Sequence, residues 1–251
     1  MPQIQRFGWI PDLPDHRDHL YAAPVQMLQN LPSNVDLTGQ CPPVYDQGDL
    51  GSCTGNGIAA AIEFDRIKQG LKDFIPSRLF IYYNERAMEG TINSDSGAQI
   101  RDGIKSVAKQ GACPEDEWPY DITKYQERPS AACYQDALND RGASYTRLVR
   151  NLNQMKGCLV SGYPFVFGFS VYDRFKPAVH GDGHVPLPAP GEGFLGGHCV
   201  LAVGYDDDNQ WFIARNSWGV IGQMRGYFTI PYAYLLDPTL ASDLWTIRLV
   251  Q

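Results

Sequence analysis

The stretch Gln47-Gly48-Asp49-Leu50-Gly51-Ser52-Cys53 decides the fold of this chain, because it places a thiol where a helix begins. From Cys53 onward, apolar residues recur with helical spacing until Gly70, a residue type that often follows the end of a helix. The sequence therefore predicts a helix over 53–68 with Ser52 as its N-cap. We expect the thiol to lie at the exposed tip of this helix, beside a turn built from glycine.

A helix N-terminus alone does not make this thiol a nucleophile. The thiolate is the reactive form, and the pKa of an unperturbed thiol is about 8.5. Lowering that pKa to ~6 requires about 3.4 kcal/mol of stabilisation of the anion, of which a helix N-terminus supplies about 1–2. Because an adjacent imidazolium must supply the remainder, the chemistry of Cys53 depends on a histidine elsewhere in the chain.

His198 is the best candidate for that histidine, since it follows two glycines and opens an apolar run typical of a strand. In the later segment Asn216-Ser217-Trp218-Gly219, the asparagine can accept a hydrogen bond from the imidazole and orient it. Trp218 would cover that bond and exclude water. Before the thiol, the Gln47 amide can reach the same oxygen as the Cys53 backbone N–H, which makes a two-donor oxyanion site. Together these groups suffice for acyl transfer through a thioester.

Each of these residues has an ordinary structural explanation when it is taken alone. A lone cysteine is more often a small buried hydrophobe, and Asn-Ser-Trp-Gly is more often a turn with a core tryptophan. The other histidines lie in segments that we expect to be solvated, and we predict no metal site; they are His16, His19, His180 and His184. The ordered set of thiol, imidazole and two amides favours the catalytic interpretation.

Composition divides the chain into three parts. Residues 1–30 are rich in proline and look extended, and we expect this arm either to pack on its own domain or to cross the active-site cleft. Residues 31–143 look helical, with further helices predicted over 76–88 and 98–109. Residues 144–251 look mainly β, with strands predicted over 164–172, 198–205, 210–215, 226–230 and 244–250. Helices followed by strands predict an α+β fold with a cleft between the two halves.

The overall composition excludes several classes of function. With a net charge of −7 and no basic tract, the chain is not expected to bind nucleic acid. Its apolar runs are far shorter than the ~20 residues needed to cross a bilayer, so no membrane span is predicted. Its six cysteines include no Cys-x-x-Cys pair, which argues against a zinc ribbon. The N-terminus lacks the apolar segment of a secretory signal, which leaves the compartment open.

The motifs together resemble the papain-type cysteine peptidases. The resemblance extends to Leu31-Pro32-Ser33-Asn34-Val35-Asp36, to Trp118-Pro119-Tyr120 and to Gly226-Tyr227-Phe228 after Gly222. It implies a papain-like two-lobe fold, with a helical left half, a β-barrel right half and no cofactor. It implies four catalytic roles, namely nucleophile for Cys53, acid and base for His198, orientation of the imidazole for Asn216 and oxyanion donor for Gln47. The substrate-binding positions that it implies are Gly51, Ser52, Gly97, Gly197, Cys199 and Trp218.

Three residues depart from the family's pattern. Leu50 stands where many members carry a structural cysteine, Thr54 replaces the bulky aromatic residue after the nucleophile, and Cys199 follows the histidine where a small residue is usual. These departures indicate a divergent, bacterial branch whose side-chain preference the sequence does not give. About 30 residues precede Leu31, fewer than the family's helical propeptide, so we expect a short N-terminal extension instead.

The sequence thus predicts a cysteine endopeptidase that acts on polypeptides and is restrained by its own arm in the cleft. An acyltransferase or amidase that uses the same thioester is the alternative within enzymes, and product analysis with added amines separates it from hydrolysis. The alternative outside enzymes is a binding module whose cleft is permanently blocked. Failure of a thiol-reactive peptide to label Cys53 would favour that module.

Overall fold

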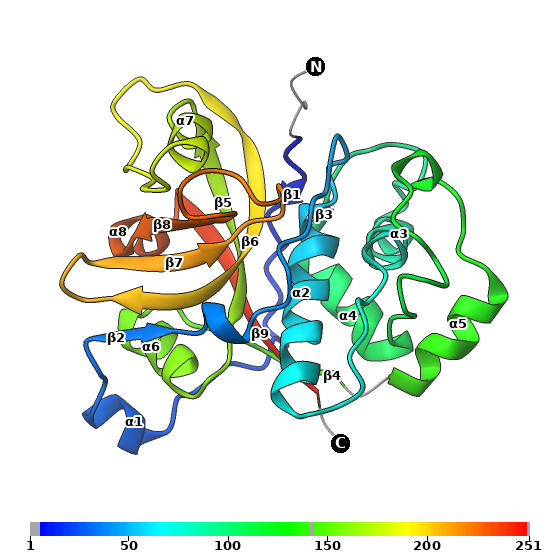
Figure 1. Ribbon diagram of the computed structural model, residues 1–251, viewed down its shortest axis with the longest axis horizontal. Helices are drawn as coiled ribbons and strands as arrows, with labels where there is room; N and C mark the ends of the chain where they lie inside the picture. Colours follow the sequence, from blue (N-terminus) through cyan, green and yellow to red (C-terminus); the bar gives the residue numbers. More distant parts are fainter. Residues whose placement is uncertain (1–5, 141–142, 250–251) are drawn as a thin grey trace.

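The computed structural model describes residues 6–140 and 143–249, and Figure 1 shows helices on one side and a sheet on the other. Residues 1–5 of the predicted arm and Val250 of the last predicted strand lie outside the described residues. The helical side comprises α2 (Cys53–Lys68), α3 (Arg78–Glu89), α4 (Ile100–Gln110) and α5 (Ala131–Ala137), with 3-10 turns at Ile122–Lys124 and Leu138–Asp140. The predicted α+β architecture is confirmed.

The sheet side is antiparallel, with strand order β4-β9-β5-β6-β7-β8 and a short β2 paired to β6. Its strands are β2 (Asn34–Asp36), β4 (Ala143–Arg147), β5 (Phe165–Tyr172), β6 (Phe194–Asp206), β7 (Trp211–Arg215), β8 (Tyr227–Pro231) and β9 (Ala241–Leu249). Short helices accompany them, namely α1 (Val25–Gln29), α6 (Leu152–Val160), α7 (Phe175–His180) and α8 (Tyr232–Leu236), and a 3-10 turn lies at Thr38–Gln40. The five predicted strands are present, whereas β2, β4 and the helices within the β half were not predicted.

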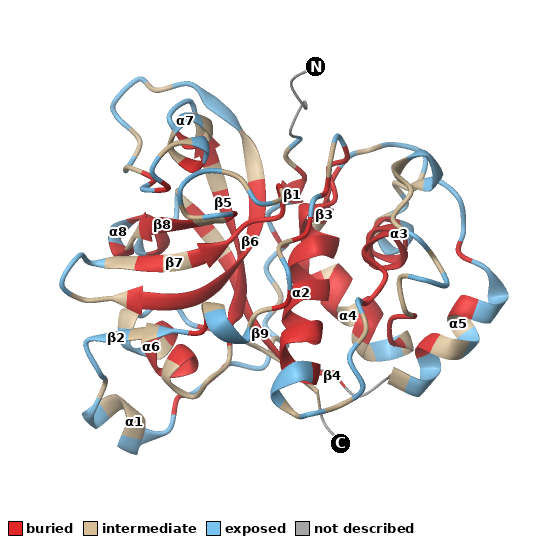
Figure 2. Ribbon diagram, viewed as in Figure 1, coloured by how far each residue is buried: buried red, intermediate tan, exposed pale blue. Residues whose placement is uncertain are grey.

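Helix α2 follows the predicted bounds, and its residues are buried from Cys53 to Arg66. Figure 2 shows that burial along most of the helix, which packs against α3 and α4 on one side and against β6, β9 and β5 on the other. Gly70 ends the helix with a φ of 66°, a left-handed conformation that favours glycine. Because α2 lies between the two halves, its first residue sits at the boundary between them.

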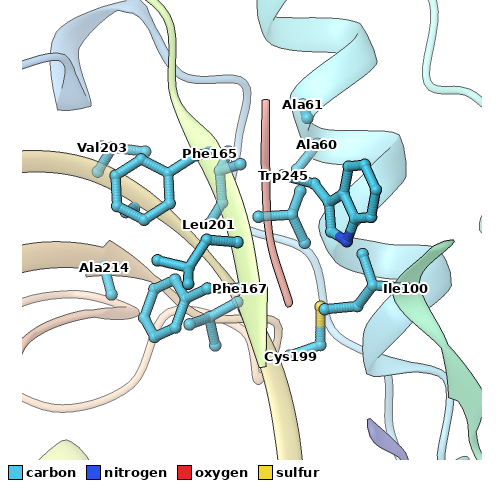
Figure 3. Packing of buried hydrophobic residues seen from close by; sticks show 14 of the residues in the cluster. Ala60, Ala61, Ile100, Phe165, Phe167, Cys199, Leu201, Val203, Ala214 and Trp245 are labelled. Atoms are coloured by element: carbon cyan, nitrogen blue, oxygen red, sulfur yellow. The ribbon is translucent and has the colours of Figure 1, made fainter. Parts of the chain in front are cut away.

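The core fills the space on both faces of the central strands. In Figure 3, Phe165, Phe167, Leu201, Val203 and Ala214 gather on one side, while Trp245, Ile100, Cys199 and the alanines of α2 gather on the other. Residues of the sheet and of α2 and α4 thus form one continuous core. Among the described residues, no helix has the length and apolar character needed to cross a bilayer.

The third predicted helix begins later than expected. Ala98 and Gln99 form a short strand, β3 (Ala98–Gln99), instead of the first helical turn, and α4 runs from Ile100 to Gln110 before Gly111. The reason is tertiary, because β3 pairs with β1 (Trp9–Ile10), which belongs to the N-terminal arm. Local spacing could not reveal a partner that lies nearly ninety residues away in the chain.

Arg86 of α3 holds the segment that leads into β3. Its side chain is fully buried, and its guanidinium donates to the carbonyl oxygens of Ile92, Ser94 and Tyr125 as well as to one within its own helix. A planar group with five N–H donors suits this task, since each buried carbonyl needs a partner.

Replacing Arg86 by methionine is expected to lower the free energy of unfolding by about 2–4 kcal/mol, because several buried carbonyl oxygens lose their donors. Urea denaturation measures this change. Arg128→Met, a substitution at an exposed arginine, is the matched control and should change stability by less than about 0.5 kcal/mol. Equal effects of the two substitutions would contradict the anchoring role of Arg86.

Candidate active site

Cys53 is the first residue of α2, and its side chain is fully buried rather than exposed at the helix tip. Burial raises the pKa of its thiol to about 12, even though the backbone N–H groups of Cys199 and Gly8 face the sulfur and lower it. Glu85, fully buried behind the nucleophile, raises the pKa further. In this closed arrangement the group is a neutral thiol, because water cannot reach it to solvate the anion.

His198 and Asn216 form the predicted hydrogen bond. The imidazole Nε2 lies 2.8 Å from Asn216 Oδ1, and both residues are buried. Because an amide oxygen only accepts, Nε2 carries the proton and Nδ1 keeps its lone pair. Nδ1 is itself buried and makes no hydrogen bond within the described residues, so its lone pair is unoccupied there. Burial lowers the pKa of His198 to about 4, which keeps the ring neutral as well.

Trp218 covers this pair as predicted. Its ring lies 4.9 Å from the imidazole, centroid to centroid, with an angle of 30° between the planes. Phe169 and Phe175 approach the same imidazole with their edges, at 5.7 Å and 6.0 Å. An aromatic enclosure of this kind excludes water and strengthens the His198–Asn216 hydrogen bond.

Gln47 points its side-chain amide into the site and is fully buried. Ser217 Oγ donates to Gln47 Oε1 over 2.6 Å, which leaves the NH2 group facing the cleft. That NH2 group donates to the carbonyl oxygens of Leu50 at 2.9 Å and of Arg6 at 3.1 Å. The donor that the sequence assigned to an oxyanion therefore already holds a carbonyl oxygen, one supplied by the N-terminal arm.

The arm crosses the site from Arg6 to Ile10. The Gly8 carbonyl accepts a hydrogen bond of 2.8 Å from the Ala98 N–H, and β1 continues in parallel with β3. Gly8 fits where no larger residue would, since a Cβ on it would lie 1.7 Å from the Gly51 carbonyl oxygen. Figure 1 shows β1 between β3 and β6, beside the first turn of α2.

Side chains of the arm complete the closure. Phe7 lies with its ring 5.9 Å from those of both His198 and Trp218. Trp9 is buried, and a Cβ added at Gly168 or Gly197 would lie within 3 Å of its indole ring. Residues 6–10 of the arm thus pack on the chain itself, against residues that the sequence assigned to the site.

Known proteins resemble this chain in both sequence and structure. A family profile described as Papain family cysteine protease matches residues 31–235. The solved structure of xylellain, a cysteine protease from Xylella fastidiosa, is 47% identical, with a TM-score of 0.92 over 98% of this chain and 96% of that chain. An uncharacterised peptidase C1-like protein of Acanthamoeba polyphaga mimivirus is 40% identical over 97% of this chain and 87% of that protein. The chain belongs to the papain family of cysteine proteases.

More distant members share the fold. A digestive procathepsin L 3 from Tenebrio molitor superposes with a TM-score of 0.73 at 19% identity, covering 92% of this chain and 74% of that one. The two-lobe, papain-like arrangement predicted from the motifs is thus confirmed, and this protein is a hydrolase that acts on peptide bonds.

In this papain-family protease, a carboxylate holds the turn before the nucleophile. Leu50 provides no disulfide there, and the six cysteines of the chain are all free. Asp95 instead accepts the Gly51 N–H at 3.0 Å and 3.1 Å through its two oxygens, and Tyr82 donates to it at 2.5 Å. Sequence reasoning missed this residue, although its position two residues before Gly97 was the available signal.

The residues beside the nucleophile also make structural contacts. Ser52 occupies the N-cap position without capping, because its hydroxyl bonds to Tyr120 and accepts from Asn56 instead. Thr54, the other departure from the family pattern, donates its hydroxyl to the buried carboxyl of Glu85. Burial raises the pKa of Glu85 well above its usual range, while the hydrogen bond from Thr54 lowers it.

Most of the predicted substrate-binding residues lie along the N-terminal arm, whereas Cys199 lies in the core. Gly51, Gly97 and Gly197 line the path of the arm; a Cβ at Gly97 would lie 2.1 Å from the Gly8 carbonyl oxygen. Trp218 faces Phe7, whereas Cys199 points into the core between β6 and α2 (Figure 3). Their part in substrate binding stays a prediction.

Asn216→Ala is expected to lower kcat by about 10- to 100-fold with a smaller change in KM, because the imidazole loses the bond that sets its tautomer and orientation. Steady-state hydrolysis of a peptide substrate measures both constants. Asn153→Ala, at an exposed position of α6, should leave them unchanged. An unchanged kcat in Asn216→Ala would show that the aromatic enclosure alone orients His198.

Proposed function

We propose that Cys53, His198, Asn216 and Gln47 carry the peptide hydrolysis of this protease. The supporting observation is the hydrogen-bonded pair of His198 and Asn216, which leaves Nδ1 as a buried acceptor on the side of the ring away from Asn216. On attack, the Cys53 thiol forms a bond to the substrate carbonyl carbon and its proton passes to Nδ1. The resulting imidazolium then protonates the leaving amine.

Gln47 stabilises the oxygen of the tetrahedral intermediate in this scheme. The carbonyl oxygen of Arg6 lies 3.1 Å from Gln47 Nε2 and marks the position where that oxygen would sit. A donor held in place by Ser217 needs no reorganisation when the charge develops, and one such donor contributes roughly 3–4 kcal/mol to lowering the barrier. Water activated by His198 then cleaves the thioester and restores the thiol.

We also propose that the arm restrains this activity while it is docked. Its Arg6 carbonyl takes the oxyanion donor, its Gly8 N–H faces the thiol, and its Phe7 ring contacts His198. Burial by the arm raises the pKa of Cys53 and lowers that of His198, so both partners are held in their neutral forms. Substrate enters only when the arm leaves, and water then reaches the pair.

Removal of the whole arm is a poor test of this restraint. Tyr21 and Ala23 are buried members of the main hydrophobic core, and the Tyr21 N–H donates to the Arg147 carbonyl. A chain that starts near Leu31 would therefore lose part of its core together with the cleft-covering segment. Single substitutions at Arg6–Ile10 separate the two effects.

Cys53→Ala is expected to abolish peptide hydrolysis and to leave the thermal unfolding temperature nearly unchanged, since one sulfur atom is removed and nothing is added. The measurement is turnover of a fluorogenic peptide together with a melting curve. Cys41→Ala removes a half-buried free thiol far from the site and should keep activity. Turnover retained in Cys53→Ala would refute the assignment of the nucleophile.

Gly8→Ala is expected to raise kcat/KM by about tenfold or more. A methyl group there overlaps the Gly51 backbone, and overlap of this kind costs about 1–3 kcal/mol, which the docked arm can relieve by leaving. Gly39→Ala is the matched control, because a Cβ at Gly39 meets nothing within 4 Å. Equal kcat/KM in both variants and the parent would reject the restraint, and loss of all turnover in Gly8→Ala would favour the blocked binding module.

A further inference from the structure

Residues 9–18 of the arm dock through a buried cluster of charged side chains, which we call the clasp. Its members are Asp12 and Asp18 of the arm, Arg101 of α4, Arg147 of β4 and Asp243 of β9. The arm contributes two of these five groups, so the clasp exists only while the arm is docked. The inference that follows rests on the proposed restraint by the arm and concerns its control.

The Asp243 carboxylate has more hydrogen-bond donors around it than the Asp12 carboxylate has. Its Oδ2 accepts the Trp9 indole N–H at 3.1 Å and the Asp12 backbone N–H at 2.8 Å. Its Oδ1 pairs with the Arg147 guanidinium at 3.1 Å. Although the residue is only 2% exposed, three donors, one of them charged, support its negative charge.

Asp12 is buried beside Asp243, and no ion pair joins it to a cation among the residues that the structure describes. Its Oδ1 accepts the Arg101 backbone N–H at 3.0 Å, and its Oδ2 accepts the Trp245 indole N–H at 2.9 Å. The Arg101 guanidinium pairs with Asp18 at 2.7 Å and donates to the Leu13 carbonyl, and its charge lowers the pKa of Asp12 less than burial and Asp243 raise it. Two neutral donors compensate a buried carboxylate poorly when a second carboxylate lies next to it.

Among the five groups that make up the clasp, the charges balance only when one carboxyl is protonated; the further cation Arg150 interacts with Asp237 and Asp243. Three carboxyls face two guanidinium groups, and Asp18 is bridged by both arginines while Asp243 is paired with Arg147. Asp12 is the carboxyl of the clasp that pairs with neither guanidinium group. We propose that docking of the arm takes up one proton on Asp12, so that acidic conditions close the cleft and neutral conditions open it.

Burial and the neighbouring Asp243 raise the pKa of Asp12 to about 7, which agrees with this assignment. Other titratable groups face the clasp from the surrounding elements. They are Glu89 of α3, whose pKa burial raises to about 7, Cys199 of β6, Arg150 beyond β4, and Asp15 and His16 of the arm. Asp12 also raises the pKa of Glu89 and of Cys199, and the pKa of Glu89 lies in the same range as that of Asp12, so mutation of Asp12 is needed to tell the two carboxyls apart.

The direction of the pH effect follows from the two states of Asp12. In the released arm its carboxyl is in water, with an ordinary pKa of about 3.9, whereas docking raises the pKa to about 7. Below about pH 4 both states are protonated and docking is strongest. From there to about pH 7 docking weakens by about tenfold per pH unit, and above pH 7 it no longer changes.

Hydrogen exchange of the full chain carrying Cys53→Ala tests this coupling, since that parent cannot digest its own arm. The readout is the protection factor, corrected for intrinsic exchange, of the amides that docking shields, namely those of Asp12 and Ala98. We expect protection to fall by about tenfold per pH unit between pH 5 and 7. Adding Asp12→Asn should remove this slope, because an amide does not titrate.

Asp15→Asn is the matched control. Asp15 lies on the same arm and pairs with Arg17 and Lys105, outside the clasp, so the slope should persist. Protection independent of pH in the parent, or an equal slope in Asp12→Asn, would overturn the proposal. The two proposals fail in different measurements. An unchanged kcat/KM in Gly8→Ala would contradict the restraint by the arm, whereas the pH dependence of the protection factors tests only the protonation of Asp12.

Discussion

The burial of helix α2 between the two halves is the constraint on which the rest of the structure depends. Because the helix packs against α3 and α4 on one side and against the sheet on the other, its first residue lies where the two halves meet. His198 and Asn216 approach the same place from neighbouring strands β6 and β7. Cys53 belongs to α2, whereas His198 and Asn216 belong to the sheet side, so no single element holds all of these residues.

The same burial controls the charge of the reactive pair. A thiolate and an imidazolium attract each other, but both are poorly solvated when water is excluded, and a neutral thiol beside a neutral imidazole is then favoured. The raised pKa of Cys53 and the lowered pKa of His198 both have burial as their main cause. In the proposed restraint the arm has two effects, since it fills the cleft and also removes the solvent on which the charged form of the pair depends.

The arm is attached through two kinds of contact with different physical character. Near Cys53 it uses backbone hydrogen bonds and close packing, which hardly depend on pH. Farther along, it places Asp12 and Asp18 among buried partners whose combined charge depends on protonation. An arm with both kinds of contact can be strongly selective for its own cleft and still be released by a change in conditions.

The sequence by itself determined the helix that begins at Cys53, the five main strands and the membership of the papain family. Local signals carry these features: helical spacing and Gly70 predict α2, apolar and β-branched runs predict the strands, and Asn-Ser-Trp-Gly marks the end of β7. Tertiary structure alone decided that Ala98 and Gln99 form a strand, that Asp95 holds the turn before Cys53, and that Asp12 meets Asp243. Each of these depends on a partner far away in the chain, and local propensity carries no information about which distant groups will be buried together.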